Sequence, residues 1–169
     1  MTYGWRAKIG FLAPAKTFDP YPWDLLLPPG VGIIGYPLGL THLTPEEVRQ
    51  AWTRADDGIR ELARRQVDII VLGGSPPVIV GGFGFDQKFI EQGAKLTSIP
   101  ITTTQTAAVE AMQHLGMKRI AVAAPFTDEF CTMLRDFLER SGFQVLSLKN
   151  RGLGLIESEP SFGQRVAQI

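Results

Sequence analysis

Short apolar runs alternate with amphipathic stretches along this chain, and the alternation limits the folds that it can adopt. Largely apolar runs occupy Ala7–Ala13, Val67–Leu72 and Lys118–Ala124, and each is followed at once by proline or glycine. Such runs are typical of strands buried in a parallel sheet. Stretches with apolar residues at helical spacing separate them. This order predicts an α/β fold with a doubly wound parallel sheet.

The ends of several elements can also be placed. Thr44 and Pro45 open a helix because a hydroxyl at the N-cap and proline at the first position favour initiation, and Glu47 completes a capping box. Gly116 and Gly142 are expected to end two later helices. Helices are expected over residues 44–65, 85–94 (with Asp86 as its cap) and 105–115, after Thr127-Asp128, and from Ser158–Pro160. Further strands are expected over residues 30–35, 99–101 and 143–148. The proline-rich segment 18–29 is expected to be irregular.

One glycine pattern is rejected as a nucleotide site. Residues Gly30-Val-Gly-Ile-Ile-Gly35 satisfy the dinucleotide pattern G-x-G-x-x-G. That pattern binds a nucleotide only where a strand precedes it and a helix begins within it. Two prolines precede this segment and Pro37 follows it closely, so a glycine-rich strand is expected instead.

Composition excludes several classes of partner and site. The 17 Lys and Arg residues balance 17 Asp and Glu residues, so no net field would attract nucleic acid or anionic lipid, and neither is expected as a partner. Cys131 is the single cysteine, which excludes an intrachain disulfide and a Cys-rich metal site. The sequence shows no signal peptide core and no apolar run of membrane-spanning length, so a cytoplasmic location is expected.

Two loops after predicted strands carry small and hydroxyl-bearing residues. They span Gly73–Gly84 and Thr102–Thr106. In a doubly wound sheet, ligands bind beyond the carboxyl ends of the strands, where glycine allows close approach and amides and hydroxyls suit a carboxylate. Turn formation and helix capping explain the same residues about equally well, so composition alone leaves both readings open.

A set of short motifs in a fixed order favours the first reading. The motifs are Ala13-Pro14, Gly30-Val-Gly32, Val71-Leu-Gly-Gly-Ser75, Pro100-Ile-Thr-Thr-Thr104 and the segment Arg119–Glu129. In this order they resemble the aspartate/glutamate racemase superfamily, and most closely its maleate cis-trans isomerase and arylmalonate decarboxylase group. The resemblance implies a Rossmann-like fold of two pseudo-symmetric α/β domains. Residues 1–115 would form the first domain, and residues 116–169 an incomplete second one.

The resemblance also implies a chemistry and the residues that perform it. Members of the group act without cofactor or metal on small mono- or dicarboxylic acids, through enediolate or carbanion intermediates held between the two domains. Gly73 stands where racemases and isomerases place their first cysteine, and glycine there resembles the decarboxylases. The other substrate-binding positions implied are Pro14 lining the pocket, Gly74 and Ser75 as oxyanion donors, and Thr102 and Thr103 facing the carboxylate from the other side.

Three departures from the family pattern follow from the same comparison of motifs. Phe126, also expected at the pocket, replaces a tyrosine whose hydroxyl would be a donor. Cys131 falls where asparagine is typical, and its apolar neighbours indicate a buried structural thiol, although a nearby helix N-terminus could lower its pKa. The second cysteine of the family lies in a segment beyond the residues of this chain. No catalytic residue can therefore be named.

Two hypotheses remain for function. One is a cofactor-independent isomerase, racemase or decarboxylase. The other is a relative that binds a small carboxylate without turnover. His42 and His114 are expected at the surface or in helix capping rather than in catalysis, and no pair of acidic residues has metal-ligand spacing. The incomplete second sheet would leave a strand edge open, from which self-association into a homo-oligomer is expected.

Overall fold

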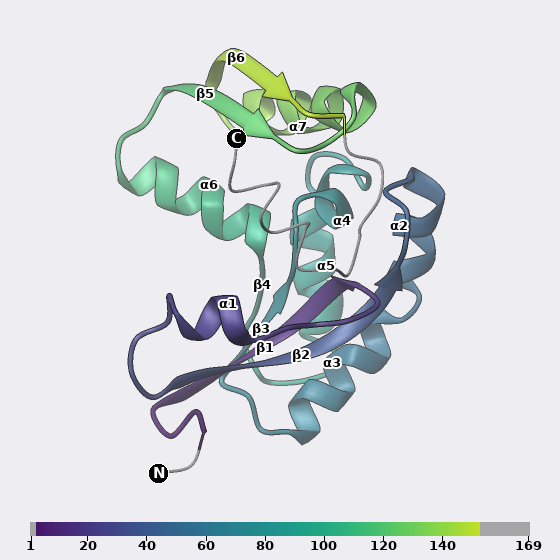
Figure 1. The fold of residues 1–169 in the computed structure, drawn as a ribbon, viewed down its shortest axis with the longest axis vertical. Helices are drawn as coiled ribbons and strands as arrows, with labels where there is room; N and C mark the ends of the chain where they lie inside the picture. Colours follow the sequence, from purple (N-terminus) through teal and green to yellow (C-terminus); the bar gives the residue numbers. More distant parts are fainter. Residues whose placement is uncertain (1–2, 153–169) are drawn as a thin grey trace.

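The computed structural model describes residues 3–152 and contains two parallel sheets (Figure 1). The strands of the first sheet are β1 (Ala7–Ala15), β2 (Val31–Leu40), β3 (Ile69–Leu72) and β4 (Ile101–Thr103), in the order β2-β1-β3-β4; those of the second are β5 (Arg119–Ala124) and β6 (Gln144–Asn150). Leu12 pairs with Leu72, which pairs with Thr103. The carboxyl ends of three strands therefore lie side by side. This confirms the predicted α/β fold with parallel strands.

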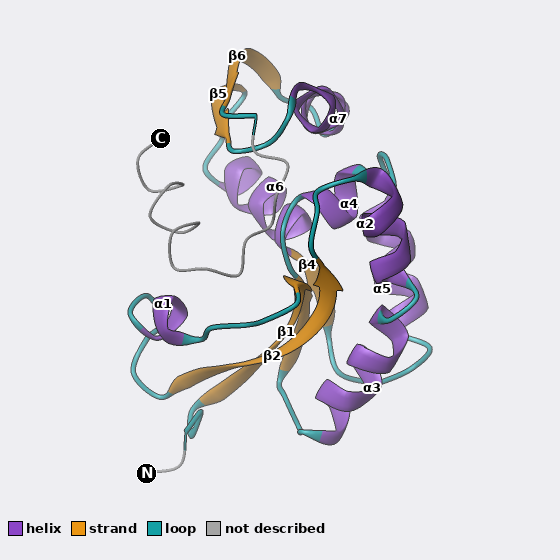
Figure 2. Cartoon of the chain, turned by 45° about the vertical axis from the view of Figure 1, so that its right-hand side comes forward, coloured by secondary structure: helices purple, strands orange, loops and turns teal. Residues whose placement is uncertain are grey.

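Most of the helices pack around the first sheet, and α7 packs on β6 of the second sheet. The helices are α1 (Tyr21–Asp24), α2 (Pro45–Trp52), α3 (Ala55–Arg64), α4 (Pro76–Ile79), α5 (Phe85–Gly93), α6 (Thr104–His114) and α7 (Asp128–Arg140). Figure 2 shows α2, α3 and α5 along one face of the sheet and α1 on the other. Gly58 lets α3 approach closely, since a Cβ there would lie 2.5 Å from the Leu12 side chain and 2.7 Å from Tyr36.

The helix expected over residues 44–65 is two helices. α2 ends at Trp52 and α3 begins at Ala55. Between them the amides of Thr53 and Arg54 each bond the carbonyl three residues earlier, and the Thr53 hydroxyl donates to Gln50 O at 2.7 Å. This tighter turn breaks the helix, because a threonine hydroxyl competes for a helical carbonyl. Helical spacing alone cannot reveal such a break.

Three proline-containing segments differ from the predicted strand end, irregular segment and loop. β1 continues past Pro14 to Ala15, with a shift in register against β2 between Ala13 and Ala15. The irregularity accommodates the missing N–H of the proline. The segment 18–29 contains the short helix α1, and Pro76 begins the short helix α4, in the loop expected to be a turn. Proline suits both because its fixed φ fits the first helical turn.

Asp86 does not cap α5 as expected. Gly84, with φ of +84°, occupies the N-cap without a side-chain bond. The Asp86 carboxylate is 6% exposed and accepts a hydrogen bond from the Thr106 hydroxyl at 2.9 Å. A buried carboxylate needs such a partner. The side chain therefore links α5 to α6.

Within the described residues β5 pairs with β6 only, so its other edge is unpaired. One hydrophobic cluster nevertheless runs through both sheets, from Leu12 and Leu72 to Ile120 and Phe137. The expected division at residues 115 and 116 falls between the two sheets, and whether the parts are separate domains stays a prediction. Self-association through the open edge also stays a prediction.

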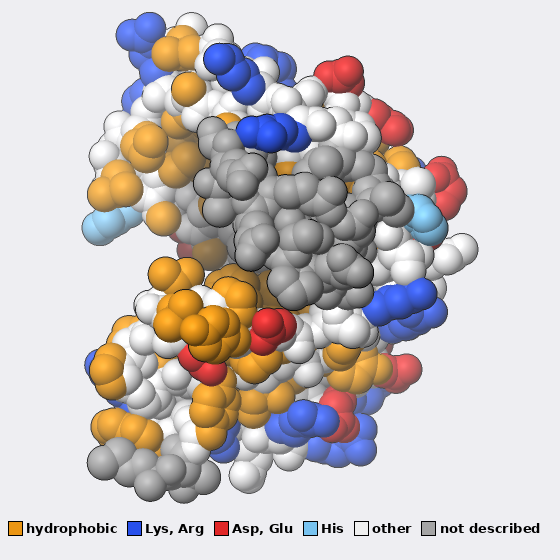
Figure 3. Space-filling view, in the orientation of Figure 1, with side chains coloured by type: hydrophobic (Ala, Val, Ile, Leu, Met, Phe, Trp, Pro, Cys, Tyr) orange, Lys and Arg blue, Asp and Glu red, His pale blue; other side chains and the backbone are white. Residues whose placement is uncertain are grey.

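Apolar side chains gather on the surface around α1. Tyr21, Leu25 and Leu26 are 64%, 70% and 80% exposed, and Trp5 is 60% exposed. Figure 3 shows hydrophobic side chains over this lower part of the molecule.

Every helix in residues 3–152 is too short or too polar to cross a lipid bilayer.

Candidate active site

The glycine loop begins where β3 ends, next to the end of β1. The Gly73 amide donates to Leu12 O at 3.0 Å, which continues the pairing of the two strands. Gly74 then turns the chain with φ of +73°, a conformation that L side chains rarely adopt. A Cβ on Gly74 would lie 3.1 Å from Cγ of Pro14. Three residues implied by the resemblance therefore meet at one edge of the sheet.

Hydrogen-bond donors in this loop are free. The amides of Gly74 and Ser75 bond no backbone acceptor among the described residues. Ser75 is the N-cap of α4, but its hydroxyl makes no capping bond. Two amides and a hydroxyl at one bend form the kind of donor cluster that binds an anion.

The threonine loop is arranged differently from the expectation. Thr103 is 0% exposed, and its hydroxyl accepts from the Thr106 amide at 2.9 Å and bonds the Thr106 hydroxyl at 2.8 Å. It is the N-cap of α6, so its hydroxyl is engaged in capping that helix. Thr102 directs its hydroxyl to the carbonyl of Thr103 at 3.5 Å. Thr104 donates to Leu72 O at 2.9 Å and thereby ties this loop to β3.

A cavity of about 480 Å³ opens between the glycine loop, α6 and the second sheet. Its polar side chains are Ser75, Gln105 and Arg119, and its apolar wall includes Met112, Phe126 and Leu134. Ser75 and Phe126 are thus at the cavity as expected, while Pro14, Gly73, Gly74, Thr102 and Thr103 do not line it. Gln105 was not among the predicted residues. Its position within the predicted loop Thr102–Thr106 was the feature of the sequence that could have identified it.

Comparison with known proteins shows the family of this chain. Residues 9–161 match the arylmalonate decarboxylase family. The chain belongs to that family. It is 24% identical over 148 residues to arylmalonate decarboxylase of Bordetella bronchiseptica and 23% identical over 111 residues to maleate isomerase of Geobacillus stearothermophilus. These matches cover 79% and 63% of this chain but 62% and 44% of those proteins. The chain therefore spans less than two thirds of the length of these relatives.

Solved structures show the same fold. Maleate isomerase of Pseudomonas putida S16, solved with maleate, matches with a TM-score of 0.79 at 19% identity, covering 88% of this chain and 64% of that one. A liganded mutant of arylmalonate decarboxylase, with a glycine-to-cysteine and a cysteine-to-serine change, matches with a TM-score of 0.83 at 24% identity, covering 90% and 65%. The first structure contains maleate, and the second is in a liganded form.

Cys131 is a structural thiol in this member of the arylmalonate decarboxylase family. It is 5% exposed, and its Sγ lies 4.0 Å from Phe126 O. Burial raises the pKa of the Cys131 thiol, the nearby Asp128 carboxylate raises it further, and the hydrogen bond with Asn150 opposes them. The predicted burial is confirmed, whereas the alternative of a pKa lowered by the helix N-terminus is wrong. The thiol is therefore protonated near neutral pH.

The other ionisable candidates do not form a site. His114 is exposed in the last turn of α6, as expected. His42 is exposed and its Nδ1 lies 2.9 Å from the Glu47 carboxylate. No group of His, Cys, Asp and Glu within residues 3–152 could hold a metal ion.

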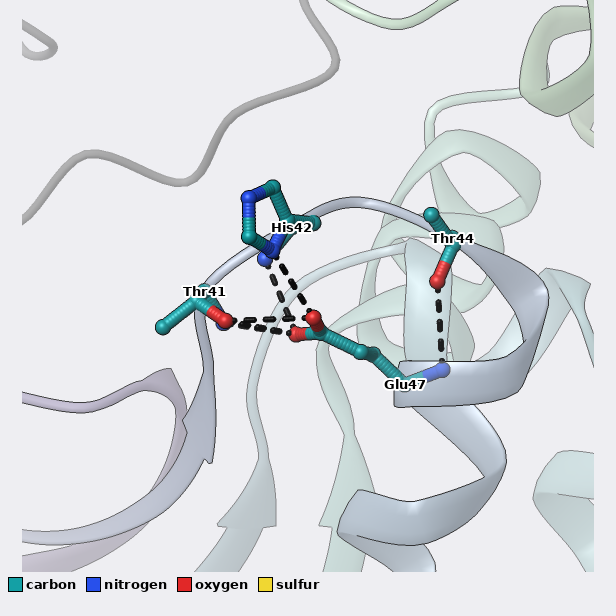
Figure 4. Close-up of polar contacts among 4 residues, drawn as sticks. All are labelled: Thr41, His42, Thr44 and Glu47. Atoms are coloured by element: carbon teal, nitrogen blue, oxygen red, sulfur yellow. Dashed lines mark hydrogen bonds and ion pairs between the residues drawn. The ribbon is translucent and has the colours of Figure 1, made fainter.

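Glu47 fixes the loop that follows β2, at the same end of the sheet as the glycine loop. The Thr44 hydroxyl accepts from the Glu47 amide at 3.2 Å, as a capping box requires. The Glu47 carboxylate, however, accepts from the amides of Thr41 and His42 at 2.8 and 2.9 Å, and from the Thr41 hydroxyl (Figure 4). The reciprocal half of the predicted capping box is therefore replaced by a clamp on the preceding loop.

This clamp should make stability depend on pH. Hydrogen bonds from the His42 and Thr41 amides lower the pKa of Glu47 to about 2. A lowered folded pKa stabilises the protein above the unfolded value near 4.5, and the contribution is lost as pH falls from there through about 2. Glu47→Gln should lower the free energy of unfolding by about 1 kcal/mol at pH 7. Thermal unfolding between pH 7 and pH 3 measures the difference, which should shrink with acid.

The matched control is Glu46→Gln, one residue earlier on the same helix. Glu46 is exposed and has only a 3.6 Å ion pair with Arg49. Its replacement should change stability by a few tenths of a kcal/mol at most. Equal losses in the two variants would contradict the role assigned to the Glu47 clamp.

Proposed function

We propose that the protein is an enzyme that acts without cofactor on a small mono- or dicarboxylic acid, through an enediolate or carbanion, as an isomerase, racemase or decarboxylase does. The supporting observation is the set of free donors at the bend of Gly74 and Ser75. Ser75 also lines a cavity of about 480 Å³, which is large enough for a small organic acid. Membership of the arylmalonate decarboxylase family supports the same class of reaction.

The donors suit the charge that develops in such a reaction. Loss of carbon dioxide or of a proton next to a carboxyl group leaves an electron pair that delocalises onto the carboxyl oxygens. The enediolate therefore carries more negative charge on oxygen than the substrate does. Fixed N–H and O–H groups stabilise it more than the ground state, and this difference lowers the barrier. The apolar wall around Phe126 reduces the polarity on that side of the site and favours the effect.

Proton transfer needs a further group. No thiol, imidazole or carboxylate among the described residues lines the cavity, and Cys131 is buried with a raised pKa. We therefore place the general acid outside residues 3–152, in accord with the family resemblance, which implies a cysteine in a following segment. The same observation supports the second candidate function, which is carboxylate binding without turnover by the chain as given.

The two candidates separate in one experiment. The protein is incubated in deuterated water with maleate, phenylmalonate and related acids, while NMR follows conversion of maleate to its trans isomer, deuterium at the α-carbon and loss of carbon dioxide. Calorimetry measures binding to the same acids. Turnover supports the enzyme, and binding without turnover supports the second candidate. If no acid binds at millimolar concentration, both are rejected.

Ser75→Ala tests the donor cluster directly. Removal of one hydrogen bond to a charged group costs about 1.5–3 kcal/mol, so the dissociation constant for the carboxylate should rise roughly ten- to a hundredfold. Ser98→Ala is the matched control, because Ser98 is exposed and lies outside the cavity. An unchanged affinity in Ser75→Ala would remove this residue from the site.

A further inference from the structure

Gln105 is a buried polar side chain that the fold does not use. It is the second residue of α6 and is 4% exposed. Its neighbours Thr103 and Thr106 bond each other and Asp86, but the Gln105 amide has no hydrogen bond among the described residues. Most polar side chains with so little exposure have a hydrogen-bond partner, so the unpartnered Gln105 amide is available to a ligand.

The free amide opens into the cavity. Within residues 3–152 no side-chain nitrogen or oxygen is both fully shielded and without a hydrogen-bond partner. Since the Gln105 side-chain amide lacks a partner, its nitrogen and oxygen cannot be fully buried. The small exposed surface of the residue therefore includes these atoms. Gln105 lines the same cavity as Ser75. The two side chains therefore supply unpartnered polar groups to one space, from two different loops.

The surroundings determine which kind of ligand group fits. The other polar side chains of the cavity are Ser75 and Arg119, and no carboxylate of the described residues lines it. Thr103 caps only the Thr106 amide, while the amides of the first helical turn carry the positive end of the helix dipole. All these groups favour an acceptor with negative charge. A carboxylate oxygen satisfies them, and an ammonium group does not.

We propose that Gln105 is a substrate-binding residue, whose side-chain N–H donates to a carboxylate oxygen of the ligand on the side opposite Ser75. The proposal rests on the proposed function, because it concerns the same cavity. It extends the site to the loop in which Thr102 and Thr103 were expected to act. The contact from that loop would come from Gln105, the third residue after Thr102, in the first turn of α6.

Three variants test the proposal by calorimetry with maleate and phenylmalonate. Gln105→Leu keeps the size but removes the donor, and should raise the dissociation constant about ten- to a hundredfold. Gln105→Glu keeps the shape but places a negative charge at the ligand, so binding at pH 7 should be weaker still. Part of that loss should return at pH 5, where a buried glutamate becomes protonated and can donate. Gln87→Leu, exposed on α5, is the control and should bind like the wild type.

The outcomes separate this proposal from the function on which it rests. If the wild type binds neither acid, the proposed function fails. If the wild type binds and the affinity falls in Ser75→Ala but not in Gln105→Leu or Gln105→Glu, only the role of Gln105 is overturned. Circular dichroism checks that each variant is folded, and Gln105→Asn, which keeps the amide but shortens its reach, replaces Gln105→Leu if the latter unfolds. Gln105→Asn should then weaken binding as well, and wild-type affinity in it would overturn the proposal.

Discussion

Gly73→Cys should lower the free energy of unfolding by about 1–3 kcal/mol, since overpacking of a filled space costs this much. A Cβ on Gly73 would lie 2.3 Å from the ring of Phe11 and 2.9 Å from the carbonyl oxygen of Leu12. The Phe11 ring is itself held between Phe18 and Trp23, with ring centroids 5.6 and 5.2 Å away. It can move aside only by disturbing that cluster. Urea denaturation of the variant and the wild type measures the loss.

A smaller residue at position 11 should restore part of the lost stability. Phe11→Leu alone should cost about 1–2 kcal/mol, because it removes part of a buried ring. In the double variant the leucine leaves room for the thiol, so the total loss should be smaller than the sum by about 1 kcal/mol. Strict additivity would show that Phe11 is not what excludes a side chain from position 73. The resemblance places a cysteine at this position in racemases and isomerases, so Phe11 and Gly73 are expected to change together.

Thr103→Val should lower the free energy of unfolding by about 2 kcal/mol. The substitution keeps the shape of a fully buried side chain but removes the oxygen that accepts from the Thr106 amide. It thus deletes an N-cap and leaves a buried N–H without a partner. The Thr106 hydroxyl, which also bonds Asp86, loses one of its two partners. Chemical denaturation gives the magnitude.

Thr103→Ser is the matched control, because serine keeps the hydroxyl and caps helices as well as threonine does. Its stability should lie within about 1 kcal/mol of the wild type, the difference being one buried methyl group. If Thr103→Val were as stable as Thr103→Ser but bound carboxylates poorly, the hydroxyl would contact the ligand and the capping role would be wrong. The expected result is the reverse, with stability changed in the valine variant.

Sequence patterns predicted the order of strands and helices because burial imposes a period on apolar residues. Largely apolar runs marked the buried strands at Val67–Leu72 and Lys118–Ala124, and the capping residue Thr44 marked the start of a helix. Patterns did not reveal the break between α2 and α3, since Thr53 interrupts the helix through its hydroxyl and not through apolar spacing. Nor did they reveal the helix at Pro76, which is shorter than any periodic signal.

The site was only partly predictable for a similar reason. Gly74 and Ser75 could be assigned from a short motif because a glycine bend has a local sequence signature. The choice among Thr102, Thr103 and Gln105 depends on which residues face inward where β4 turns into α6, and this is set by the pairing of Thr103 with Leu72. The two threonines have hydroxyls that suit a ligand, yet that register places Thr103 in the core. Residue chemistry alone therefore pointed to the threonines, whereas Gln105 is the residue of this loop that lines the cavity.

The hydrophobic cluster that joins the two sheets has a consequence for how the molecule responds to change. Because Leu12 and Leu72 belong to the same buried cluster as Ile120 and Phe137, we expect the walls of the cavity to unfold together. Loosening at the end of β3 should therefore reach β5 and the bend after it, where Phe126 lies. The geometry of the pocket should then be lost in one step when the chain unfolds.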